Sequence, residues 1–448
     1  MSEEITKDLK RIVPKRWKRY PRCKDSGVEW IGEIPEGWET VRLKHLTKKI
    51  GSGITPRGGA ENYLVWGIPL IRSQNVQFEG LSLEGLAHIS DEQNKKMINS
   101  KALPNDVLLN ITGASIGRTC MVPQNMEQSN VNQHVCIIRP RRSSLSQFMW
   151  RFLSSEAGQI QVFEGEDGIS REGLNFERIK NFVITLPPDD DRKRITAYLD
   201  SNLTAIVSLI SKKQRLIELL KEKRAAIITQ AVTKGLDHNA PMKDSGVEWI
   251  GEIPKHWRIL KTKHVTNQRN IKQVNSDKSE RYVGLENVES WTGLLLSTTD
   301  PESLSGDCLE FRQGDVLFGK LRPYLAKAWQ ADFSGLCSGE FIVLEPKKMI
   351  GMYLVYLLRN PNFIDFIDSL TYGVKMPRLS PEQFMNLEVP FPDNNEQEKI
   401  ASFIREETSK IDFFISKIEK SIELLKEYRS ALITAAVTGK IDVREEVP

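Results

Sequence analysis

The sequence predicts an α+β protein that repeats one plan twice. It contains two α+β modules separated by two long helices, and these helices pack as an antiparallel coiled coil about a pseudo-two-fold axis. Three observations predict this fold. Twelve residues near the N-terminus recur unchanged later in the chain, a longer similarity recurs at a different offset, and both copies of the longer similarity have the apolar spacing of a coiled coil. At 448 residues the chain is long enough for about three domains.

The first repeat establishes the duplication. Lys24–Pro35 reads KDSGVEWIGEIP, and Lys243–Pro254 reads the same twelve letters. The match continues more loosely, because Trp38 corresponds to Trp257. Chance does not produce twelve identical consecutive residues. Two copies of over 200 residues indicate domain duplication rather than a solenoid of short repeats.

The second repeat gives the domain order. Residues 181–237 align with residues 386–442, whereas the segments 48–180 and 267–385 differ greatly. We therefore expect a shared start, a variable module and a shared helix, and then the same order again. The expected parts are an N-terminal basic extension (1–23), a first module (24–180), a first helix region (181–237), a second module (238–385) and a second helix region (386–448).

Each module is expected to contain short strands around one small core. Runs of β-branched and apolar residues bounded by Gly, Asn and Pro occur in matching order in the two modules. The matched strand pairs are Asp106–Leu109 with Asp315–Phe318, Ile71–Val76 with Val283–Val288, and Cys136–Pro140 with Ile342–Pro346. Helical patterns at Leu145–Glu156 and Ile350–Leu358 lie between them.

The repeated C-terminal parts are expected to be uninterrupted helices of some 44 residues, or about 66 Å. Apolar residues recur at intervals of four and three, with Lys213 and Arg224 at two positions of the first seam. The first seam contains Leu199, Leu203, Ile206, Ile210, Ile217, Leu220, Ile227 and Ala231; the second contains Ile404, Thr408, Ile411, Ile415, Ile422, Leu425, Leu432 and Ala436. The simplest arrangement packs the helices on each other, and the alternative pairs each with a partner chain. Arg224 and Arg429 recur at equivalent positions, where arginine side chains snorkelling over apolar neighbours are expected.

Composition narrows the functional classes. With 63 Lys+Arg against 59 Asp+Glu, the net charge of +4 excludes a histone-like protein. The longest nearly apolar run, 350–358, is too short to cross a bilayer, and the acidic start shows no signal peptide, so a cytoplasmic protein is expected. The five cysteines and six histidines form no C-x-x-C or H-x-x-x-H pair, so neither disulfides nor a metal site is expected.

Catalytic motifs are not evident. There is no G-x-x-x-x-G-K-[ST] loop, and the single Pro-Pro, at Pro187–Pro188, lacks the flanking residues of an amino-methyltransferase motif. Asp191 and Lys193 form D-x-K, but an acidic helix start explains the same letters. We therefore expect a protein that is not an enzyme.

Several motifs run through most of the chain. They are GEIPEGW and GEIPKHW at the two module starts, WGIPLIRSQNV (66–76), DVLLNITGASIGRT (106–119), NVNQHVCIIRP (130–140) and VPFPDNNEQEKI (389–400). In this arrangement the chain resembles the specificity (S) subunit of type I restriction–modification enzymes over nearly its whole length. The first half departs at DRKRI (191–195), and the second module has KLRPY (320–324) in place of the TGASIG loop.

The resemblance implies a non-catalytic DNA-recognition subunit with two target recognition domains, each reading one half of a bipartite, asymmetric sequence. It implies that the helices hold these domains apart and bind modification subunits. It places S-adenosylmethionine on the modification subunits and ATP with Mg²⁺ on restriction subunits, and no cofactor on this chain.

Candidate DNA-binding residues gather at the ends of the expected strands. Such residues must place hydrogen-bonding groups on base edges and cations on phosphates. In the first module they are Arg72, Ser73, Gln74, Asn75, Thr112, Gly113, Ser115, Arg118, Asn132 and Gln133. In the second they are Asn287, Lys320, Arg322, Tyr324, Lys327, Lys375 and Arg378. Turn chemistry or a solvated face explains any one of them equally well, and the clustering is what favours binding.

Two basic segments allow more than one interpretation, and so does the function of the chain. The start KRWKRY (15–20) suits a phosphate backbone or a frayed tail. Residues 191–235 carry 10 Lys+Arg against 4 Asp+Glu, which suits simple solvation or a face toward DNA or an acidic partner. The alternative to the S subunit is a stand-alone DNA-binding regulator with two readers, or an enzyme whose site the sequence does not reveal.

Overall fold

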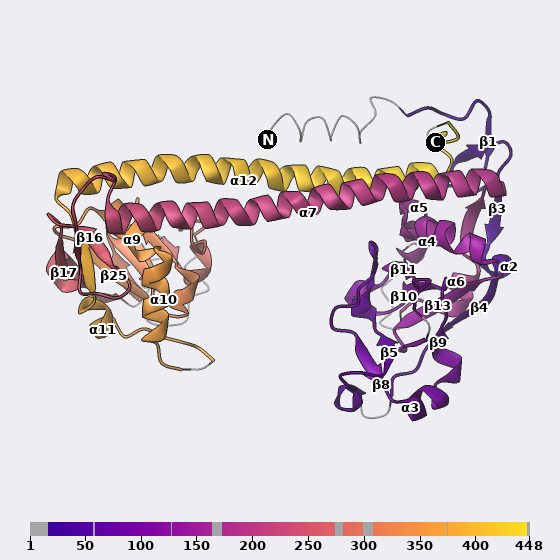
Figure 1. Ribbon diagram of the computed structural model, residues 1–448, viewed down its shortest axis with the longest axis horizontal. Coiled ribbons are helices and arrows are strands. Elements are labelled where there is room, and N and C mark those ends of the chain that lie inside the picture. Colours follow the sequence, from indigo (N-terminus) through magenta and orange to yellow (C-terminus); the bar gives the residue numbers. More distant parts are fainter. Residues whose placement is uncertain are drawn as a thin grey trace. The chain divides into compact units, whose positions relative to one another are not determined.

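The structure is a computed structural model that describes residues 17–56, 59–126, 128–163, 173–273, 281–298, 308–373 and 375–445. The chain divides into two compact units: unit 1 comprises residues 1–212 and 420–448, and unit 2 comprises residues 213–419. Each unit contains one α+β module and part of each long helix, α7 (Asp189–Lys234) and α12 (Asn394–Val437) (Figure 1). Module 1 denotes the part of unit 1 before α7, and module 2 the part of unit 2 between α7 and α12.

Module 1 is built on two four-stranded sheets. One has the order β11 (Thr119–Met121), β10 (Val107–Asn110), β13 (Val135–Pro140) and β4 (Thr47–Ser52), and all of its pairs are antiparallel. The other has the order β8 (Ala87–Ile89), β5 (Ile68–Ile71), β12 (Ser129–Val131) and β9 (Lys101–Ala102), with β5 and β12 parallel. Strand β10 is buried along its whole length, as expected for a central strand of apolar residues.

Smaller elements complete module 1. The two-stranded pairs are β1 (Cys23–Asp25) with β2 (Glu33–Pro35), β3 (Glu39–Arg42) with β14 (Val183–Leu186), and β6 (Val76–Gln77) with β7 (Gly80–Leu81). The helices are α2 (Leu43–Leu46), α3 (Asp91–Lys96), α4 (Ser146–Ser154), α5 (Glu156–Phe163) and α6 (Phe176–Lys180). Helix α4 buries Phe148, Met149, Phe152 and Leu153, so its apolar face covers the β10 sheet.

Module 2 repeats most of this topology, but the outer strand of its second sheet lies on the opposite edge from that in module 1. Its first sheet has the order β18 (Thr266–Arg269), β25 (Phe341–Pro346), β22 (Val316–Gly319) and β23 (Ala328–Gln330). Its second sheet has the order β19 (Lys272–Gln273), β21 (Cys308–Phe311), β24 (Gly335–Ser338) and β20 (Tyr282–Val283). The small pairs are β15 (Met242–Asp244) with β16 (Glu252–Pro254) and β17 (Arg258–Lys261) with β26 (Glu388–Phe391). The helices are α8 (Thr262–Val265), α9 (Gly351–Leu358), α10 (Pro361–Ser369) and α11 (Pro381–Met385). One parallel pair, β20 with β24, again lies among antiparallel ones.

The strands predicted around 107, 136, 316 and 342 are confirmed, but two predicted strands are shorter. Strand β5 ends at Ile71, and residues 73–75 form a single 3-10 turn, η2. In module 2, β20 ends at Val283, and residues 285–287 form the equivalent turn, η6. The cause is the same in both modules, because a buried asparagine side chain bonds to the backbone and turns the chain.

The long helices pack antiparallel within each unit. In unit 1, Leu199 and Leu203, early in α7, share a core with Leu432 and Ala436, late in α12. In unit 2, Val232, late in α7, shares a core with residues 400–404, early in α12. The predicted pairing of the two helices within one chain is therefore confirmed. The buried seam of α7 differs at two places from the predicted one. Leu209 and Ile228 are buried, whereas the predicted seam residues Ile210 and Ile227 are only partly buried. At these places the helix packs on a module as well as on the other helix.

The repeated dodecapeptide packs against the end of one long helix in each unit and so connects that helix to the module. In unit 1 a Cβ on Gly439, just after α12, would lie 2.2 Å from Cδ of Pro35, and its φ of +71° suits glycine. In unit 2, Gly235 takes the same place after α7, with φ +72°, against Trp257 and Pro254. Glycine thus permits both the helix end and the close approach to the repeated motif.

At the start of α7, where the sequence DRKRI (191–195) departs from the family motif, an arginine side chain bonds to the helix entry. Arg192 is 3% exposed, and its guanidinium donates to Asp189 at 2.6 Å and to the carbonyl of Pro187. Gln397 occupies the corresponding place in unit 2 and donates to the carbonyl of Pro392 at 2.9 Å. Different side chains therefore satisfy the same proline carbonyl at the entry of each helix.

The N-terminal basic segment is only partly described, because residues 1–16 lie outside the described ranges. From Trp17 onward the chain packs on the end of unit 1: the Trp17 ring lies 6.3 Å from that of Tyr428, and Lys18 pairs with Glu445 at 2.6 Å. Within the described ranges, no helix is long and apolar enough to cross a membrane, and no three metal-ligand side chains gather. All five cysteines are free thiols, and burial raises the pKa of Cys120 and Cys136 to about 12.

Candidate nucleic-acid interface

The candidate residues of module 1 come from three chain segments that meet at one end of the sheets. The backbone N–H of Asn132 donates to the carbonyl of Ile71, which joins the ends of β12 and β5. The side chain of Asn110 donates to the carbonyl of Ser73 at 2.8 Å and to the hydroxyl of Ser115 at 3.1 Å. The structure therefore unites the 72–75, 112–118 and 132–133 candidates, which the sequence predicts only as separate clusters.

Within the 72–75 turn, the four side chains differ in what they can offer to DNA. Gln74 is exposed. Arg72 is half-buried, lies 5.3 Å over the Tyr63 ring and donates to the carbonyl of Gly85 at 2.7 Å. Asn75 is fully buried; its oxygen accepts from the N–H of Arg72, and its nitrogen donates to two backbone carbonyls, those of Ser82 and Glu84. Asn75 is therefore a turn-forming residue, which corrects its place among the DNA-contact candidates.

The 112–118 loop and the 132–134 turn are held together by a residue that the sequence patterns did not single out. The ring Nδ1 of His134 lies 2.6 Å from the hydroxyl of Thr112, and the backbone N–H of His134 donates to Oδ1 of Asn132. Asn132 is 6% exposed, whereas Gln133 beside it is exposed. The sequence did offer one sign of this role, because His134 directly follows the candidate amides Asn132 and Gln133. Gly113 has φ +73°, and a Cβ added there would have no neighbour within 4 Å, so the loop surface at this residue is open.

Arg118 closes this surface on the side of β6. Its guanidinium donates to Oε1 of Gln77 at 3.2 Å, and the side chain is half-buried. Module 1 therefore presents the exposed amides of Gln74 and Gln133 beside the half-buried guanidinium groups of Arg72 and Arg118. Such amides and guanidinium groups are the donors that read base edges in the major groove.

The candidates of module 2 occupy the corresponding end of its sheets with different chemistry. Lys320, directly after β22, stands where Ile111 follows β10, and the 320–325 segment pairs with the segment around 378 through an isolated bridge between Leu321 and Arg378. The structure thus joins the Lys320, Arg322 and Tyr324 stretch to the Lys375 and Arg378 stretch. Arg322 and Tyr324 are exposed, and Arg322 has φ +49°, a left-handed conformation unusual for arginine.

Three of the module 2 candidates are engaged within the protein. Asn287 is 4% exposed, and its oxygen accepts from the N–H of Gly284 at 2.7 Å, as Asn75 does in module 1. Lys327 donates to the carbonyl of Leu285 at 2.6 Å, and partial burial lowers its pKa, with Glu286 opposing the shift. Arg378 pairs with Glu340 at 2.8 Å. Asn287 is therefore a turn-forming residue, and its place among the DNA-contact candidates is likewise corrected.

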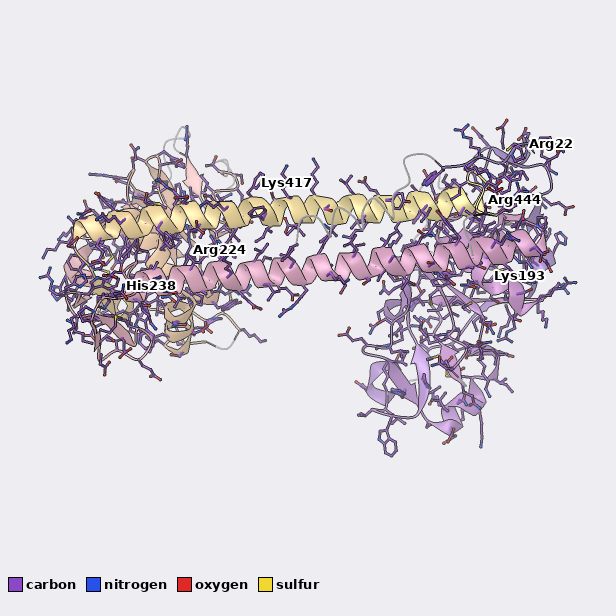
Figure 2. All side chains as sticks on the ribbon, turned by 45° about the horizontal axis from the view of Figure 1, so that its top comes forward. Arg22, Lys193, Arg224, His238, Lys417 and Arg444 are labelled. Carbon is purple, nitrogen blue, oxygen red and sulfur yellow. The ribbon has the colours of Figure 1, made fainter. Side chains whose placement is uncertain are left out.

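The arginines shared by the two helices tie each helix pair to its module. In unit 2, Arg224 on α7 is 9% exposed, lies 3.3 Å from Asp412 of α12 and donates to the carbonyl of Trp291 in module 2 (Figure 2). In unit 1, the equivalent Arg429 pairs with Glu79 of module 1. The expectation that these arginines merely snorkel over apolar neighbours is wrong, because each has a specific partner in a module.

Comparison with known proteins decides the family. A model described as the type I restriction modification DNA specificity domain matches residues 35–219 and 257–424, one match in each repeat. The chain belongs to this family. It is thus a DNA specificity subunit, a non-catalytic component of type I restriction–modification enzymes.

Relatives and a solved structure agree with this membership. The specificity subunit is 23% identical over 430 residues to the type I restriction enzyme MjaVIII specificity subunit of Methanocaldococcus jannaschii, covering 92% of this chain and 94% of that one. It is 20% identical over 428 residues to the EcoDI specificity subunit of Escherichia coli, covering 92% and 90%. A chain from a structural study of complex assembly in the type I R-M system superposes with a TM-score of 0.67 at 14% identity, over 91% of this chain and 99% of that chain, which confirms the fold.

Proposed function

We propose that each module reads one half of a bipartite, asymmetric DNA sequence. The observation that carries this proposal is that corresponding ends of the shared sheets bear different side chains in the two modules. Module 1 exposes the amides of Gln74 and Gln133, and module 2 exposes Arg322 and Tyr324. Two readers with one scaffold and two chemistries suit a target whose halves differ in sequence.

The proposed contact set follows from which side chains are accessible. The exposed Gln74 and Gln133 are the base readers of module 1, and the open loop around Gly113, with Thr112 and Ser115, lies against the phosphate backbone. In module 2, Lys320, Arg322, Tyr324 and Lys375 are the contacts. Five further candidates act by holding their neighbours, because each is engaged with a group of its own module: Arg72, Arg118, Asn132, Lys327 and Arg378.

The domain borders belong to this proposal as well. Residues 24–180 and 238–385 are the target recognition domains, and the helix regions 181–237 and 386–448 set the gap between them and bind the modification subunits. Exposed aromatic residues on α12 support a docking role: in unit 2, Phe413 and Phe414 are 57% and 56% exposed. Modification subunits would supply S-adenosylmethionine, and restriction subunits would supply ATP with Mg²⁺, so that the complex acts on DNA in the cytoplasm.

The alternative is a stand-alone regulator that binds DNA through the same two modules. The exposed Phe413 and Phe414 favour the subunit role, since a regulator that works alone has no use for an apolar surface on its helices. Co-expression with a modification (methyltransferase) subunit of a type I enzyme separates the two. A stable complex is expected of a specificity subunit, and sequence-specific binding that neither needs nor recruits a methyltransferase is expected of a regulator.

The decisive experiment exchanges one recognition domain. Residues 48–180 are replaced by the corresponding segment of a relative, and the methylated motif made with the modification subunit is sequenced. One half of the motif is expected to change while the other half and the gap stay as they were. The reciprocal exchange of residues 267–385 is the matched control and should change the opposite half. A change in both halves from either exchange contradicts the assignment of modules to half-sites.

A further inference from the structure

Between α10 and α11 of module 2, the described residues 372–373 and 375–378 form the two sides of a hairpin. The N–H of Arg378 donates to the carbonyl of Tyr372 at 3.1 Å, and the N–H of Tyr372 donates back at 3.3 Å. Gly373 has φ +93°, which lets the chain reverse. Residue 374 lies outside the described ranges, and the other members define the 372–378 hairpin.

The hairpin is anchored at its base to the segment that carries the module 2 candidates. The N–H of Arg322 donates to the carbonyl of Pro377 at 2.8 Å, and the N–H of Leu379 donates to the carbonyl of Lys320 at 2.9 Å. The guanidinium of Arg378 donates to Glu340 at 2.8 Å. Arg378 is thus a positioning residue that fixes the hairpin against the sheet.

The side chains of the hairpin are apolar and exposed. Tyr372 is 60% exposed, Met376 is 58% exposed, and neighbouring Tyr324 is 40% exposed. A methionine and two tyrosines at one exposed site gain nothing for folding, and exposed apolar groups of this size mark a contact surface. The hairpin therefore has a partner that covers it.

The charges around the hairpin favour a nucleic acid as that partner. The exposed Lys375 and Arg322 flank the apolar side chains, with Lys320 beside them. The nearby carboxylate of Glu340 is engaged by Arg378. Cations that border an apolar tip suit DNA, whose phosphates attract the cations while the tip reaches the bases.

We propose, building on the proposed function, that the 372–378 hairpin enters the duplex at the second half-site and presses Met376 against a base step, which unstacks it. Lys375 and Lys320 hold the adjacent phosphates, and Tyr372 packs on the exposed base face. Flexible apolar side chains are used in this way by proteins that kink DNA. The recognition of the second half-site then depends on how easily one of its steps deforms as well as on hydrogen bonds to base edges.

The first half-site is expected to lack this contact. At the offset of 205 residues that relates the two repeats, the sequence of module 1 reads DGISREG (167–173), with arginine in the place of Met376 and no aromatic residue. The wedge is therefore a property of one half-site, and the other half-site provides an internal control.

The test uses the full chain, with its modification subunit, and a duplex that contains the methylated motif. The fluorescent base 2-aminopurine is placed at successive positions of each half-site. Wild-type protein is expected to raise the fluorescence at one step of the second half-site and at none of the first. Met376→Ala should abolish this rise and weaken binding about fivefold, the lower end of what one stacked base contributes because methionine has no ring, whereas Met376→Leu should retain both. Ile98→Ala, which removes a similarly exposed apolar side chain from module 1, is the matched control and should leave the rise intact.

Three outcomes would overturn the proposal. Met376→Ala with undiminished fluorescence and affinity shows that the hairpin does not touch bases. Met376→Ala that binds DNA normally but no longer co-purifies with the modification subunit shows that the hairpin docks a protein. If the wild-type complex binds no sequence specifically, the proposed function fails as well. Thermal unfolding of each variant confirms that it is folded, and the exposure of Met376 makes a loss of folding unexpected.

Discussion

The indole N–H of Trp257 donates a 2.8 Å hydrogen bond to Oε2 of Glu396 and thereby joins the repeated motif to the first turn of α12. Nε2 of His256 lies 2.9 Å from the same oxygen. In unit 1 the corresponding bond, from Trp38 to Asp191 in the first turn of α7, is longer at 3.4 Å. A carboxylate at a helix N-terminus is favoured by the helix dipole, and the buried indole fixes its position. The repeated motif and the helix entry are therefore parts of one joint.

This joint should be stronger in unit 2 than in unit 1. Trp257→Phe removes a hydrogen bond to a charged group, which typically contributes about 1.5–3 kcal/mol to the free energy of unfolding. Trp38→Phe removes the same volume from an equally buried site but a longer hydrogen bond, so its loss should be smaller. Denaturant unfolding of both variants measures the difference. Equal losses would show that the indole N–H contributes nothing beyond packing.

Replacement of the buried turn asparagines should cost stability rather than one base contact. Asn75→Ala leaves the carbonyls of Ser82 and Glu84 and the N–H of Arg72 without their partner, at a cost of about 1–3 kcal/mol. Asn287→Ala should have a similar effect in module 2. The thermal midpoint should fall for both variants and stay unchanged for Gln74→Ala, whose side chain is exposed. An unchanged midpoint for Asn75→Ala would restore it as a contact candidate.

The ion pair between Glu79 and Arg429 should make the attachment of module 1 to α12 depend on pH. Burial by itself raises the pKa of Glu79, but the hydrogen bond and charge of Arg429 outweigh it, so the pKa lies below its ordinary value of 4.5. Because the folded-state pKa is lowered, the stabilisation is complete above the ordinary value. It is lost as the pH falls through the lower folded value.

The measurement compares the unfolding free energy of wild type and Glu79→Gln as a function of pH. The half-exposed pair should contribute about 0.5–1 kcal/mol near neutral pH, and the difference between the two proteins should vanish in the acid range below 4.5. Glu84→Gln, an exposed change in the same module, is the control. A difference that persists at acid pH would mean that the charge of Glu79 is not its source.

Single substitutions in the recognition domains should act on one half-site each. Gln133→Ala should weaken discrimination in the first half-site and Arg322→Ala in the second, by about 1–3 kcal/mol if a base contact is lost. Binding to duplexes with changes in one half-site at a time gives the measurement. Each variant is the control for the other, and a loss spread over both half-sites would contradict the assignment.

The gap between the half-sites should lengthen with the helices. Because α7 and α12 are antiparallel within each unit, both must grow together, so four helix-forming residues are inserted after Lys212 and after Lys417. Each helix gains about 6 Å, close to two base pairs at about 3.4 Å each. The methylated motif should keep its bases and gain one or two unspecified positions. Insertion into one helix alone should disrupt the pair. If the variant with both insertions is active and its motif keeps the original gap, the partner subunits rather than the helices set the spacing.

The sequence by itself determined the duplication, the α+β class, the central strands and the apolar seam of each long helix, and it left open whether the two seams pack on each other or on a partner chain. These features depend on local order along the chain. Twelve identical residues indicate a repeat wherever they fold, the apolar run of β10 or β22 has one stable place in a sheet, and a four–three apolar spacing gives a helix one face to bury. The family followed from motifs that are equally local.

Only the tertiary structure decided what the polar side chains do. Asn75 and Gln74 are neighbours of similar polarity, yet one amide is buried against Ser82 and Glu84 while the other is exposed. Arg429 is a helix residue whose partner, Glu79, lies 350 positions away in the sequence. A polar group is available to DNA only if the protein leaves it unsatisfied, and its partners are set by distant segments that meet on folding. For that reason the sequence could name candidate contacts but could not separate the exposed ones from those that support their neighbours.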